Sequence, residues 1–364
     1  MTSKLSIKNV RKSYGAVQAL KETSLEVPEG EFLTLLGPSG SGKTTLLMTL
    51  AGLALPDGGE IWIDGTLSTY APSHLRDIGM VFQNYALFPH LTIYENIAFP
   101  LRMRRIGAAE IDRKVKRILE IVRLPHVAER YPNELSGGQQ QRIALARCTV
   151  YQPSIVLMDE PLGALDKKLR DEMQLEIKTL HKELNTTILY VTHDQEEAMS
   201  MSDRICLMND GQIEQLGTPN DLYFAPKSIF TALFLGGANM LPVKVKGRDG
   251  ELNAYEGPSG ELIRAPADGA PTDKADLSVM VRPEHIRLLA GSDTEENSVA
   301  VRVTNSVMVG PVTKYFGDLS DGTPITFTQL TTAPTRSAGI GDTIRVGWSA
   351  ARSVVLPGRS PAHG

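Results

Sequence analysis

Residues 32 to 44 decide the fold of this chain, and they are Phe32-Leu33-Thr34-Leu35-Leu36-Gly37-Pro38-Ser39-Gly40-Ser41-Gly42-Lys43-Thr44. The run from Phe32 to Leu36 is continuously apolar and ends at a glycine, which is typical of a strand buried on both faces. The residues from Gly37 to Thr44 match G-x-x-x-x-G-K-[ST], a loop that joins a strand to a helix and cradles phosphates. Together with the strands and helices that alternate over residues 1 to 236, this predicts an α/β fold with a mostly parallel sheet.

The residue types of this loop indicate nucleotide chemistry. Glycines let backbone amides converge on phosphate oxygens, Lys43 brings a positive charge to the β- and γ-phosphates, and the Thr44 hydroxyl is a ligand for Mg²⁺. A glycine-rich turn formed by chance is the alternative, and the flanking strand and helix argue against it. We expect nucleotide contacts along the whole loop: Gly37, Pro38, Ser39, Gly40, Ser41, Gly42, Lys43, Thr44 and Thr45.

Two further apolar runs, residues 154–158 and 187–191, also end at polar side chains. The carboxyl ends of parallel strands meet at one edge of the sheet, where open α/β folds bind ligands. Asp159, after the first run, is expected to hold the metal, and Glu160 to orient and deprotonate the attacking water. His193, after the second, can sense the γ-phosphate or the water. The alternatives are a solvated acidic pair and a surface histidine.

Gln83 and Tyr14 are two further candidates. Gln83 follows the run from Ile78 to Phe82 and is a neutral ligand for water or Mg²⁺, although a polar strand end needs no such role. Tyr14 precedes Gly15 and offers a π-face to an adenine ring, although an isolated tyrosine is more often a packing residue.

A second glycine-rich segment, Leu135-Ser136-Gly137-Gly138-Gln139, precedes another predicted helix. One nucleotide requires only one phosphate loop, so the second indicates either two ligands or a site assembled from two surfaces.

The composition argues against several other classes of protein. A length of 364 residues fits two domains, and the net charge of -4 argues against electrostatic binding of nucleic acid as the main role. Cys148 and Cys206 are the only cysteines, so a disulfide framework is improbable. No apolar stretch approaches the length of a membrane span, and the start of the sequence lacks the apolar core of a signal peptide. Work at a membrane would therefore need other chains to span it.

The composition also changes after Gly236-Gly237. We expect an α/β domain over residues 1–236, with a helical insertion at about 84–150. Residues 237–364 carry short valine-rich runs separated by turns such as Asp249-Gly250 and Asp321-Gly322, which predict a small all-β barrel.

These motifs, in this order, resemble those of the nucleotide-binding subunit of an ABC transporter. The similarity covers residues 1 to about 236. The matching motifs are Gly37 to Thr44 (Walker A), Gln83 (Q-loop), Leu135 to Gln139 (signature), Met158 to Glu160 (end of Walker B), Leu165-Asp166 (D-loop), His193 (switch histidine) and Tyr14 (adenine-stacking aromatic). The signature, followed by Gln140 to Arg147, is far more specific than the phosphate loop alone.

The resemblance implies an ATPase that uses ATP and Mg²⁺ and works as a head-to-tail homodimer. The residues implied to contact nucleotide across the dimer are Ser136, Gly137, Gly138, Gln139 and Asp166. Those implied for catalysis are Glu160, His193 and Gln83, and those for the metal are Thr44, Gln83 and Asp159. Gly163 departs from the family, many members of which have serine there, and we expect it to alter cross-subunit hydrogen bonding slightly.

The resemblance also implies partners. The family's ATPases sit on the cytoplasmic face of the inner membrane, bound to two transmembrane permease subunits and linked indirectly to an extracytoplasmic solute-binding protein. We expect several apolar side chains of the segment from Asn84 to Leu91 to be exposed together. This segment corresponds to the region that contacts a permease coupling helix; a buried core loop is the alternative. Residues from about 238 resemble the oligonucleotide-binding-like domain of importer ATPases, best at Val281 to Ile286. That domain lacks a dense basic and aromatic face, so no nucleic acid is expected.

Within the family, residues 82–90 and 162–170 most resemble ATPases of polyamine (spermidine/putrescine) importers. Importers of ferric iron, aminoethylphosphonate, sulfate and sugars share much of this sequence and remain alternatives. A soluble ABC ATPase acting on nucleic acid or the ribosome is an alternative of another class, but no long coiled-coil insertion or second cassette is visible. A binding switch without turnover would have lost the base, yet Glu160 and His193 are present.

Overall fold

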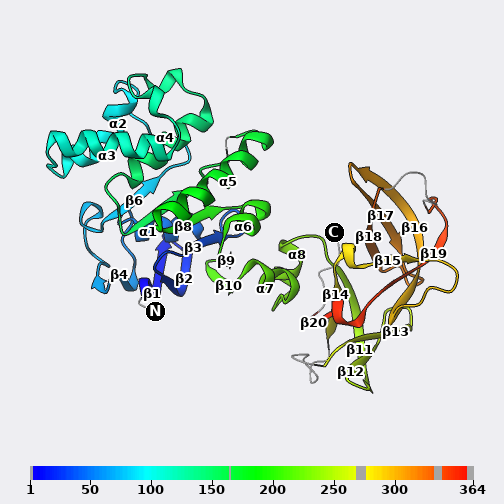
Figure 1. The fold of residues 1–364 in the computed structure, drawn as a ribbon. Helices are drawn as coiled ribbons and strands as arrows, with labels where there is room; N and C mark the ends of the chain where they lie inside the picture. Colours follow the sequence, from blue (N-terminus) through cyan, green and yellow to red (C-terminus); the bar gives the residue numbers. More distant parts are fainter. Residues whose placement is uncertain (1–2, 164, 268–275, 332–337, 359–364) are drawn as a thin grey trace. The chain divides into compact units, whose positions relative to one another are not determined.

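The computed structural model describes residues 3–163, 165–267, 276–331 and 338–358. The chain forms two compact units, Met1–Pro219 and Asn220–Gly364 (Figure 1). The division falls earlier in the chain than the predicted boundary at residue 236.

The first unit is built on a six-stranded sheet. Its strands, in spatial order, are β10 (Gln212–Gly217), β9 (Arg204–Asn209), β3 (Phe32–Leu36), β8 (Thr187–Thr192), β7 (Ile155–Asp159) and β6 (Ile78–Val81). All pairs from β9 to β6 are parallel, and only β10 is antiparallel. The three predicted apolar runs are the neighbouring strands β3, β8 and β7, so the α/β prediction is confirmed and the polar residues that follow them meet at one edge.

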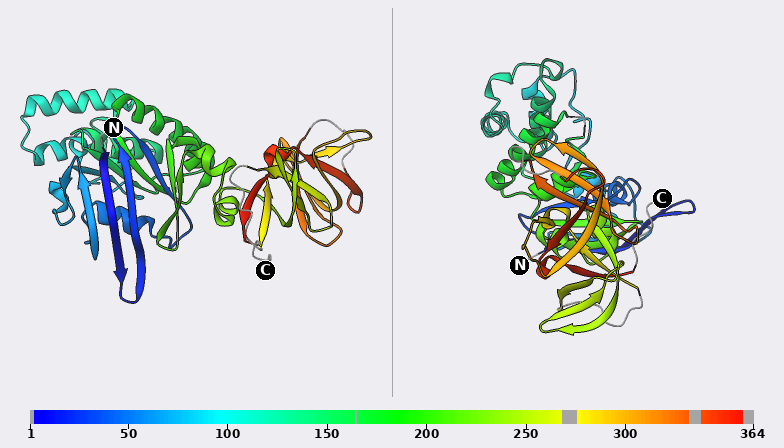
Figure 2. Two further views of the ribbon diagram at one scale, coloured as in Figure 1. Left: turned by 90° about the horizontal axis from the view of Figure 1, so that it is seen from below. Right: turned by 90° about the vertical axis from the view of Figure 1, so that its right-hand side faces the viewer.

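Alternating side chains divide the core into two layers, one on each face of this sheet. On one face Leu33, Leu35 and Leu157 pack with helix α1 (Lys43–Leu50) and with a four-stranded antiparallel sheet. That sheet contains β2 (Val17–Pro28), β1 (Ser3–Tyr14), β4 (Gly58–Ile63) and β5 (Thr66–Leu67). On the opposite face Val156 and Met158 pack with the helices α2 (Ile93–Met103), α3 (Ala108–Ile121), α4 (Gly137–Thr149) and α5 (Lys167–Leu184). Figure 2 shows the blue strands and the cyan-to-green helices on the two sides.

The predicted helical insertion lies between β6 and β7 and contains α2, α3 and α4. Two of these helices, α2 and α4, begin at a side-chain cap. Thr92 and Glu95 form a reciprocal capping box at the start of α2, which satisfies amides that have no partner within the helix. In α3 the buried residues Ile111, Val115 and Ile118 lie on one face, so this amphipathic helix packs onto the same core.

The second unit is all-antiparallel, which confirms the predicted small β domain. One five-stranded sheet contains β13 (Leu262–Pro266), β12 (Leu252–Glu256), β11 (Asn239–Asp249), β14 (Leu277–Val281) and β20 (Val354–Pro357). The other contains β15 (Arg287–Leu289), β19 (Thr343–Trp348), β16 (Asn297–Val309), β17 (Val312–Asp318) and β18 (Pro324–Leu330). Both contribute to one core, in which Tyr255, Phe327 and Trp348 are fully buried.

A buried arginine explains why the division comes before residue 236. Arg282 is 1% exposed and donates hydrogen bonds to four carbonyl oxygens: Tyr223 (2.9 Å), Ala232 (2.8 Å), Gly236 (3.4 Å) and Gly237 (3.3 Å). These acceptors lie in or just after α7 (Pro219–Phe224) and α8 (Ile229–Phe234). Arg282 therefore fastens this helical segment to the β domain.

Two sequence expectations concern membranes and thiols. Over the described ranges, no helix is both long enough and apolar enough to cross a membrane. Cys148 and Cys206 are free and buried, and burial raises the pKa of each thiol to about 12.

We predict that Arg282→Leu destabilises the second unit by about 3 kcal/mol, because it leaves buried carbonyls without donors. The two tryptophans offer a clean readout, since Trp348 is buried in the second unit and Trp62 lies in the first. In a Trp62→Phe background, urea unfolding followed by Trp348 fluorescence measures the second unit. Arg287→Leu, which removes only a surface ion pair with Glu295, should cost less than about 1 kcal/mol. Equal effects would contradict the role of Arg282.

Candidate active site

The phosphate loop connects β3 to α1 and needs glycine at two tightly packed points. Gly37 has φ +157°, and a Cβ there would lie 2.2 Å from the carbonyl oxygen of Met208. Gly42 has φ +98°, and its Cβ would lie 2.6 Å from the carbonyl oxygen of Ala19. The loop is therefore pressed against the backbones of β9 and β2, which fixes its shape before any ligand binds.

Lys43 carries the positive charge of this loop. Its side chain is 5% exposed, and its Nζ donates to the carbonyl oxygens of Gly37 and Pro38, both at 2.9 Å. Burial lowers the pKa of Lys43, while the carboxylates of Glu160 and Asp159 raise it. A cation held inside a loop of backbone groups fits a phosphate group.

The other predicted loop residues lie around this cation. Gly37, Ser41 and Gly42 are buried, Pro38 and Thr45 are half-buried, and Ser39, Gly40 and Thr44 are exposed.

Asp159 and Thr44 meet where β7 ends beside α1. Burial raises the pKa of Asp159 and the charge of Glu160 raises it further, whereas Lys43 and a hydrogen bond from Thr44 lower it. A carboxylate and a hydroxyl side by side next to a phosphate loop are the oxygen ligands that suit Mg²⁺. These two residues therefore fit the metal that the sequence predicts.

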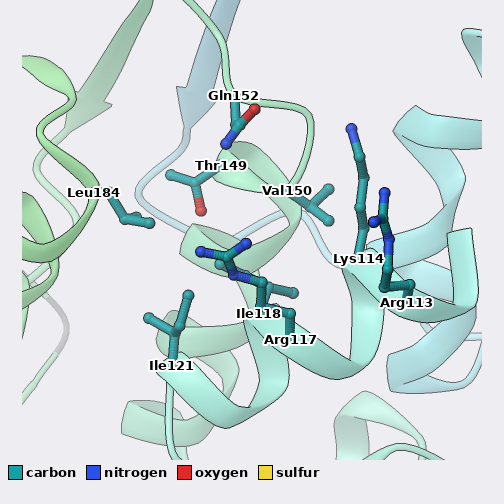
Figure 3. Close-up of a pocket in the computed structure, with 9 residues that line it drawn as sticks. All are labelled: Arg113, Lys114, Arg117, Ile118, Ile121, Thr149, Val150, Gln152 and Leu184. Atoms are coloured by element: carbon teal, nitrogen blue, oxygen red, sulfur yellow. The ribbon is translucent and has the colours of Figure 1, made fainter. Parts of the chain in front are cut away.

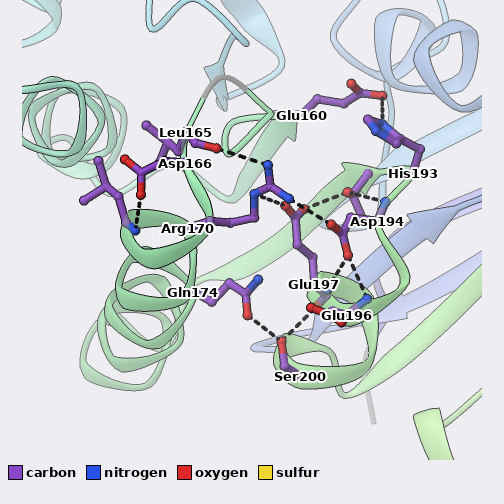
Figure 4. A network of polar contacts seen from close by, with 12 residues as sticks. Glu160, Leu165, Asp166, Arg170, Gln174, His193, Asp194, Glu196, Glu197 and Ser200 are labelled. Atoms are coloured by element: carbon purple, nitrogen blue, oxygen red, sulfur yellow. Dashed lines mark hydrogen bonds and ion pairs between the residues drawn. The ribbon is translucent and has the colours of Figure 1, made fainter. Parts of the chain in front are cut away.

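Glu160 and His193 form a second pair at the same edge. His193 Nδ1 lies 3.2 Å from Glu160 Oε1, and the two residues follow the neighbouring strands β7 and β8 (Figure 4). Glu160 has the left-handed backbone angle φ 43°, and its amide donates to the carbonyl oxygen of Val191. Such backbone strain in a non-glycine residue is common at functional sites. The pair combines a carboxylate that can accept a proton with an imidazole that holds it in place.

Gln83 lies beside this pair. Its Nε2 is 3.6 Å from the position that a Cβ on Gly163 would occupy, and that position is 3.5 Å from the carbonyl oxygen of Glu160. These are ordinary contact distances, so a serine at Gly163 would also fit. The assignment of Gln83 to the metal stays a prediction.

The second glycine-rich segment begins α4, and two of its predicted ligands, Ser136 and Gln139, also cap this helix. The Ser136 amide donates to Gln139 Oε1 at 3.0 Å, and Gln139 N donates to Ser136 Oγ at 3.4 Å. This capping box engages the side-chain oxygen of Gln139 inside its own chain. The sequence pattern S-x-x-Q is the signal that could have indicated it.

The two glycines of this segment differ. A Cβ on Gly138 would lie 3.0 Å from Leu169 Cδ1, so this glycine permits close packing of α4 on α5. Among the described residues, a Cβ on Gly137 would meet only Leu165, at 3.5 Å. Ser136 is exposed and Gly137 half-buried, so these two are the members available to a ligand.

Asp166 and Tyr14 lie at the edges of the first unit. Asp166 is exposed and caps α5, since its Oδ1 accepts a hydrogen bond from Leu169 N at 3.0 Å. Tyr14 lies at the β1–β2 hairpin, is 53% exposed, and has Lys12 Nζ 5.4 Å from its ring centroid. Its contact with adenine stays a prediction.

The segment from Asn84 to Leu91 is less exposed than expected. Tyr85 is buried, Leu87 and Phe88 are half-buried, and Arg147 donates to the carbonyl oxygens of Tyr85 and Ala86. The expectation that several apolar side chains of this segment are exposed together is therefore wrong, because they pack into the helical core.

An apolar groove next to this segment was not predicted from the sequence. A cavity of about 630 Å³ is lined mainly by apolar side chains, among them Leu53, Leu75, Phe82, Met103 and Tyr151, and also by the charged Asp77 and Arg104. The side chains of Leu53, Leu75 and Met103 are more than half exposed. The sequence signal that could have indicated this groove is the presence of large apolar residues, Leu53, Leu75 and Met103, outside the regular apolar patterns of the strands and helices.

A second cavity, of about 270 Å³, lies beside α3 (Figure 3). Arg113, Lys114 and Arg117 line it together with apolar residues, and Arg113 and Lys114 both lie near Glu110. None of the predicted site residues borders it.

Two family models match the chain. The one described as ABC transporter matches residues 20–163, and the one described as TOBE domain matches residues 279–356.

Curated relatives and solved structures agree with these matches. The spermidine/putrescine import ATP-binding protein PotA of Thermotoga maritima is 42% identical over 321 residues, 87% of each chain. PotA of Aliivibrio fischeri is 40% identical over 356 residues, 97% of this chain and 95% of the relative. A dimeric bacterial ABC transporter cassette of known structure has a TM-score of 0.53 at 37% identity, covering 59% of this chain and 98% of its own.

We predict that Glu160→Gln lowers the pKa of Asp159, because the charge of Glu160 is one of the causes that raise it. Carbon-detected NMR titration of the Asp159 carboxyl measures this. Glu196→Gln, at an exposed glutamate in the first turn of α6 (Gln195–Met201), is the control and should leave the pKa unchanged. A pKa of Asp159 that stays the same or rises in Glu160→Gln would show that the two carboxylates do not interact.

Proposed function

The chain belongs to the ABC transporter family of ATP-binding proteins, and on that premise we propose that it hydrolyses ATP to drive the import of a polyamine. The observation that carries the proposal is the single sheet edge where Lys43, Asp159 and the Glu160–His193 pair meet. The polyamine follows from the names of the relatives, which cover nearly the whole chain. Ferric iron, aminoethylphosphonate, sulfate or a sugar are the alternative cargoes.

The proposed reaction transfers the γ-phosphoryl group of ATP to water, giving ADP and phosphate. The backbone amides of the phosphate loop and Lys43 bind the β- and γ-phosphates and stabilise the charge that develops on them. Glu160 orients the water and takes its proton, and His193 holds Glu160 Oε1 in position. Thr44 and Asp159 would hold Mg²⁺, which neutralises charge on the phosphate oxygens when bound. Gln83, beside Glu160, contacts the water.

We propose that two copies act head to tail, with Ser136 and Gly137 of one covering ATP on the phosphate loop of the other. Two observations support this. The helices that carry the two glycine-rich segments, α1 and α4, pack on opposite faces of the central sheet. In the second segment Gly138 packs against α5 and the Gln139 side chain caps α4, whereas Gly137 and Ser136, which is exposed although its Oγ accepts from Gln139 N, remain accessible. A dimeric structural relative agrees with it.

The proposed partners are two transmembrane permease subunits, which would place the chain on the cytoplasmic face of the membrane. The apolar groove supports this, because large exposed apolar groups beside a hollow are typical of protein contact sites. Phe82, which lines the groove, directly precedes Gln83. A permease element in the groove would therefore lie close to the catalytic loop.

We predict that Glu160→Gln lowers the rate of ATP hydrolysis by about 10²–10⁴-fold, as expected when a general base is lost, while ATP binding persists. The measurement uses the chain isolated with its membrane partners and reconstituted into vesicles, with spermidine uptake recorded in parallel. Uptake should require ATP and should stop in the variant. The exposed Glu196→Gln variant is the control and should hydrolyse and transport normally.

The two readouts separate the parts of the proposal. Comparable hydrolysis by the wild type and Glu160→Gln would reject the base. Hydrolysis without spermidine uptake would retain the ATPase and reject the polyamine in favour of another cargo.

A further inference from the structure

Arg170, in the first turn of α5, joins three parts of the first unit. Its NH2 donates to the carbonyl oxygen of Leu165 at 3.1 Å, and its NH1 donates to Asp194 Oδ2 at 3.1 Å. Its Nε lies 3.9 Å from Glu197 Oε1 (Figure 4). The guanidinium thus connects the turn before α5 with the loop that carries His193, through a planar group that bonds in several directions at once.

The Asp194 end of this connection directly adjoins His193. The other oxygen of Asp194, Oδ1, accepts hydrogen bonds from the amides of Glu196 and Glu197 and so caps α6. The amide of Asp194 donates to Thr192 Oγ1 at 3.0 Å. His193 therefore stands between two residues whose positions are fixed by hydrogen bonds.

Glu197 anchors the network to the sheet. It is 3% exposed, and its Oε2 accepts hydrogen bonds from Tyr190 (2.8 Å) and Thr192 (2.7 Å), both on β8. Burial raises the pKa of Glu197, and the nearby Arg170 lowers it. Arg170 thus lies between this anchored carboxylate and the Leu165 carbonyl, and its hydrogen bonds link the position of Leu165 to that of Asp194.

We propose that Arg170 is a positioning residue that makes the Leu165–Asp166 turn and the His193 loop move together. The exposed Asp166 lies on the surface that the proposed dimer would cover, so this inference rests on the proposed function. Contact at Asp166 would shift the Leu165 carbonyl, and Arg170 would pass the shift through Asp194 to His193 and its partner Glu160. Each active site would then be set by docking of the second copy.

The alternative is a plain structural brace between α5 and α6, and the chain supplies a control for it. Lys178 Nζ, further along α5, donates to the carbonyl oxygen of Ser200 on α6, and Gln174 bonds the Ser200 hydroxyl. These contacts join the same two helices away from His193. Losing Lys178 tests bracing alone, whereas losing Arg170 tests bracing and coupling.

The test compares Arg170→Gln, Arg170→Lys and Lys178→Met for thermal stability and for the kcat and KM of ATP hydrolysis. Arg170→Gln should lower kcat by roughly 10- to 100-fold with KM almost unchanged, as expected for misplaced catalytic groups. Arg170→Lys keeps the charge and should recover part of kcat. Lys178→Met should keep the wild-type kcat. Activity losses that simply follow stability in all three variants would overturn the proposal.

A double-mutant cycle with Asp166→Ala tests the coupling itself. Asp166→Ala should cost little extra kcat once Arg170 is replaced, but its full cost should remain in Lys178→Met. Additive losses with Arg170→Gln would reject the coupling. Wild-type hydrolysis separates the two levels: no hydrolysis overturns the proposed function and this inference together, whereas an active wild type with equally active Arg170→Gln overturns this inference alone.

Discussion

The hydrogen bonds of the buried Lys43 ammonium to the loop carbonyls are the interaction on which the site of the first unit depends. A charge at this depth is costly by itself, and here it is held by loop carbonyls and by the fields of Asp159 and Glu160. The carboxylate of Asp159 is itself unfavourably placed, since burial raises its pKa and the charge of Glu160 raises it again. The parallel strands β3, β7 and β8 have to end at one edge to bring these groups within reach of each other. A bound phosphate would place negative charge beside Lys43, and a bound metal would place positive charge beside Asp159.

In the proposed head-to-tail dimer, the same architecture would make one copy incomplete as a catalyst. The phosphate loop opens from the layer of α1, and the second glycine-rich segment starts a helix in the opposite layer. A second copy can place its own second glycine-rich segment over the phosphate loop of the first. In this view the groups that sense the partner, such as Asp166, and those that do chemistry, such as His193, need a physical link, and Arg170 is the side chain placed to provide it.

Much of the first unit was predictable because its signals are local. The strands β3, β7 and β8 are short apolar runs, and the residues that follow them, such as Glu160, acquire their neighbours from the parallel topology alone. The features that were not predictable depend on pairs far apart in sequence. The burial of Tyr85 depends on helix packing, and the earlier unit boundary depends on Arg282 reaching back to α7 and α8. Gln139 was predicted as a nucleotide ligand because the signature motif was interpreted only as a phosphate-binding segment. Its side chain also caps α4.

The most direct test of a site shared between two copies mixes two inactive variants. Lys43→Ala removes the cation of the phosphate loop, and Gly137→Asp places a negative charge in the second segment, where Gly137 has room for a side chain. A mixed head-to-tail dimer contains one site with both defects and one site with neither. The account predicts that each variant alone is inactive and that mixing them restores ATP hydrolysis. Activity that stays absent after mixing, with mixed dimers shown to form, would contradict it.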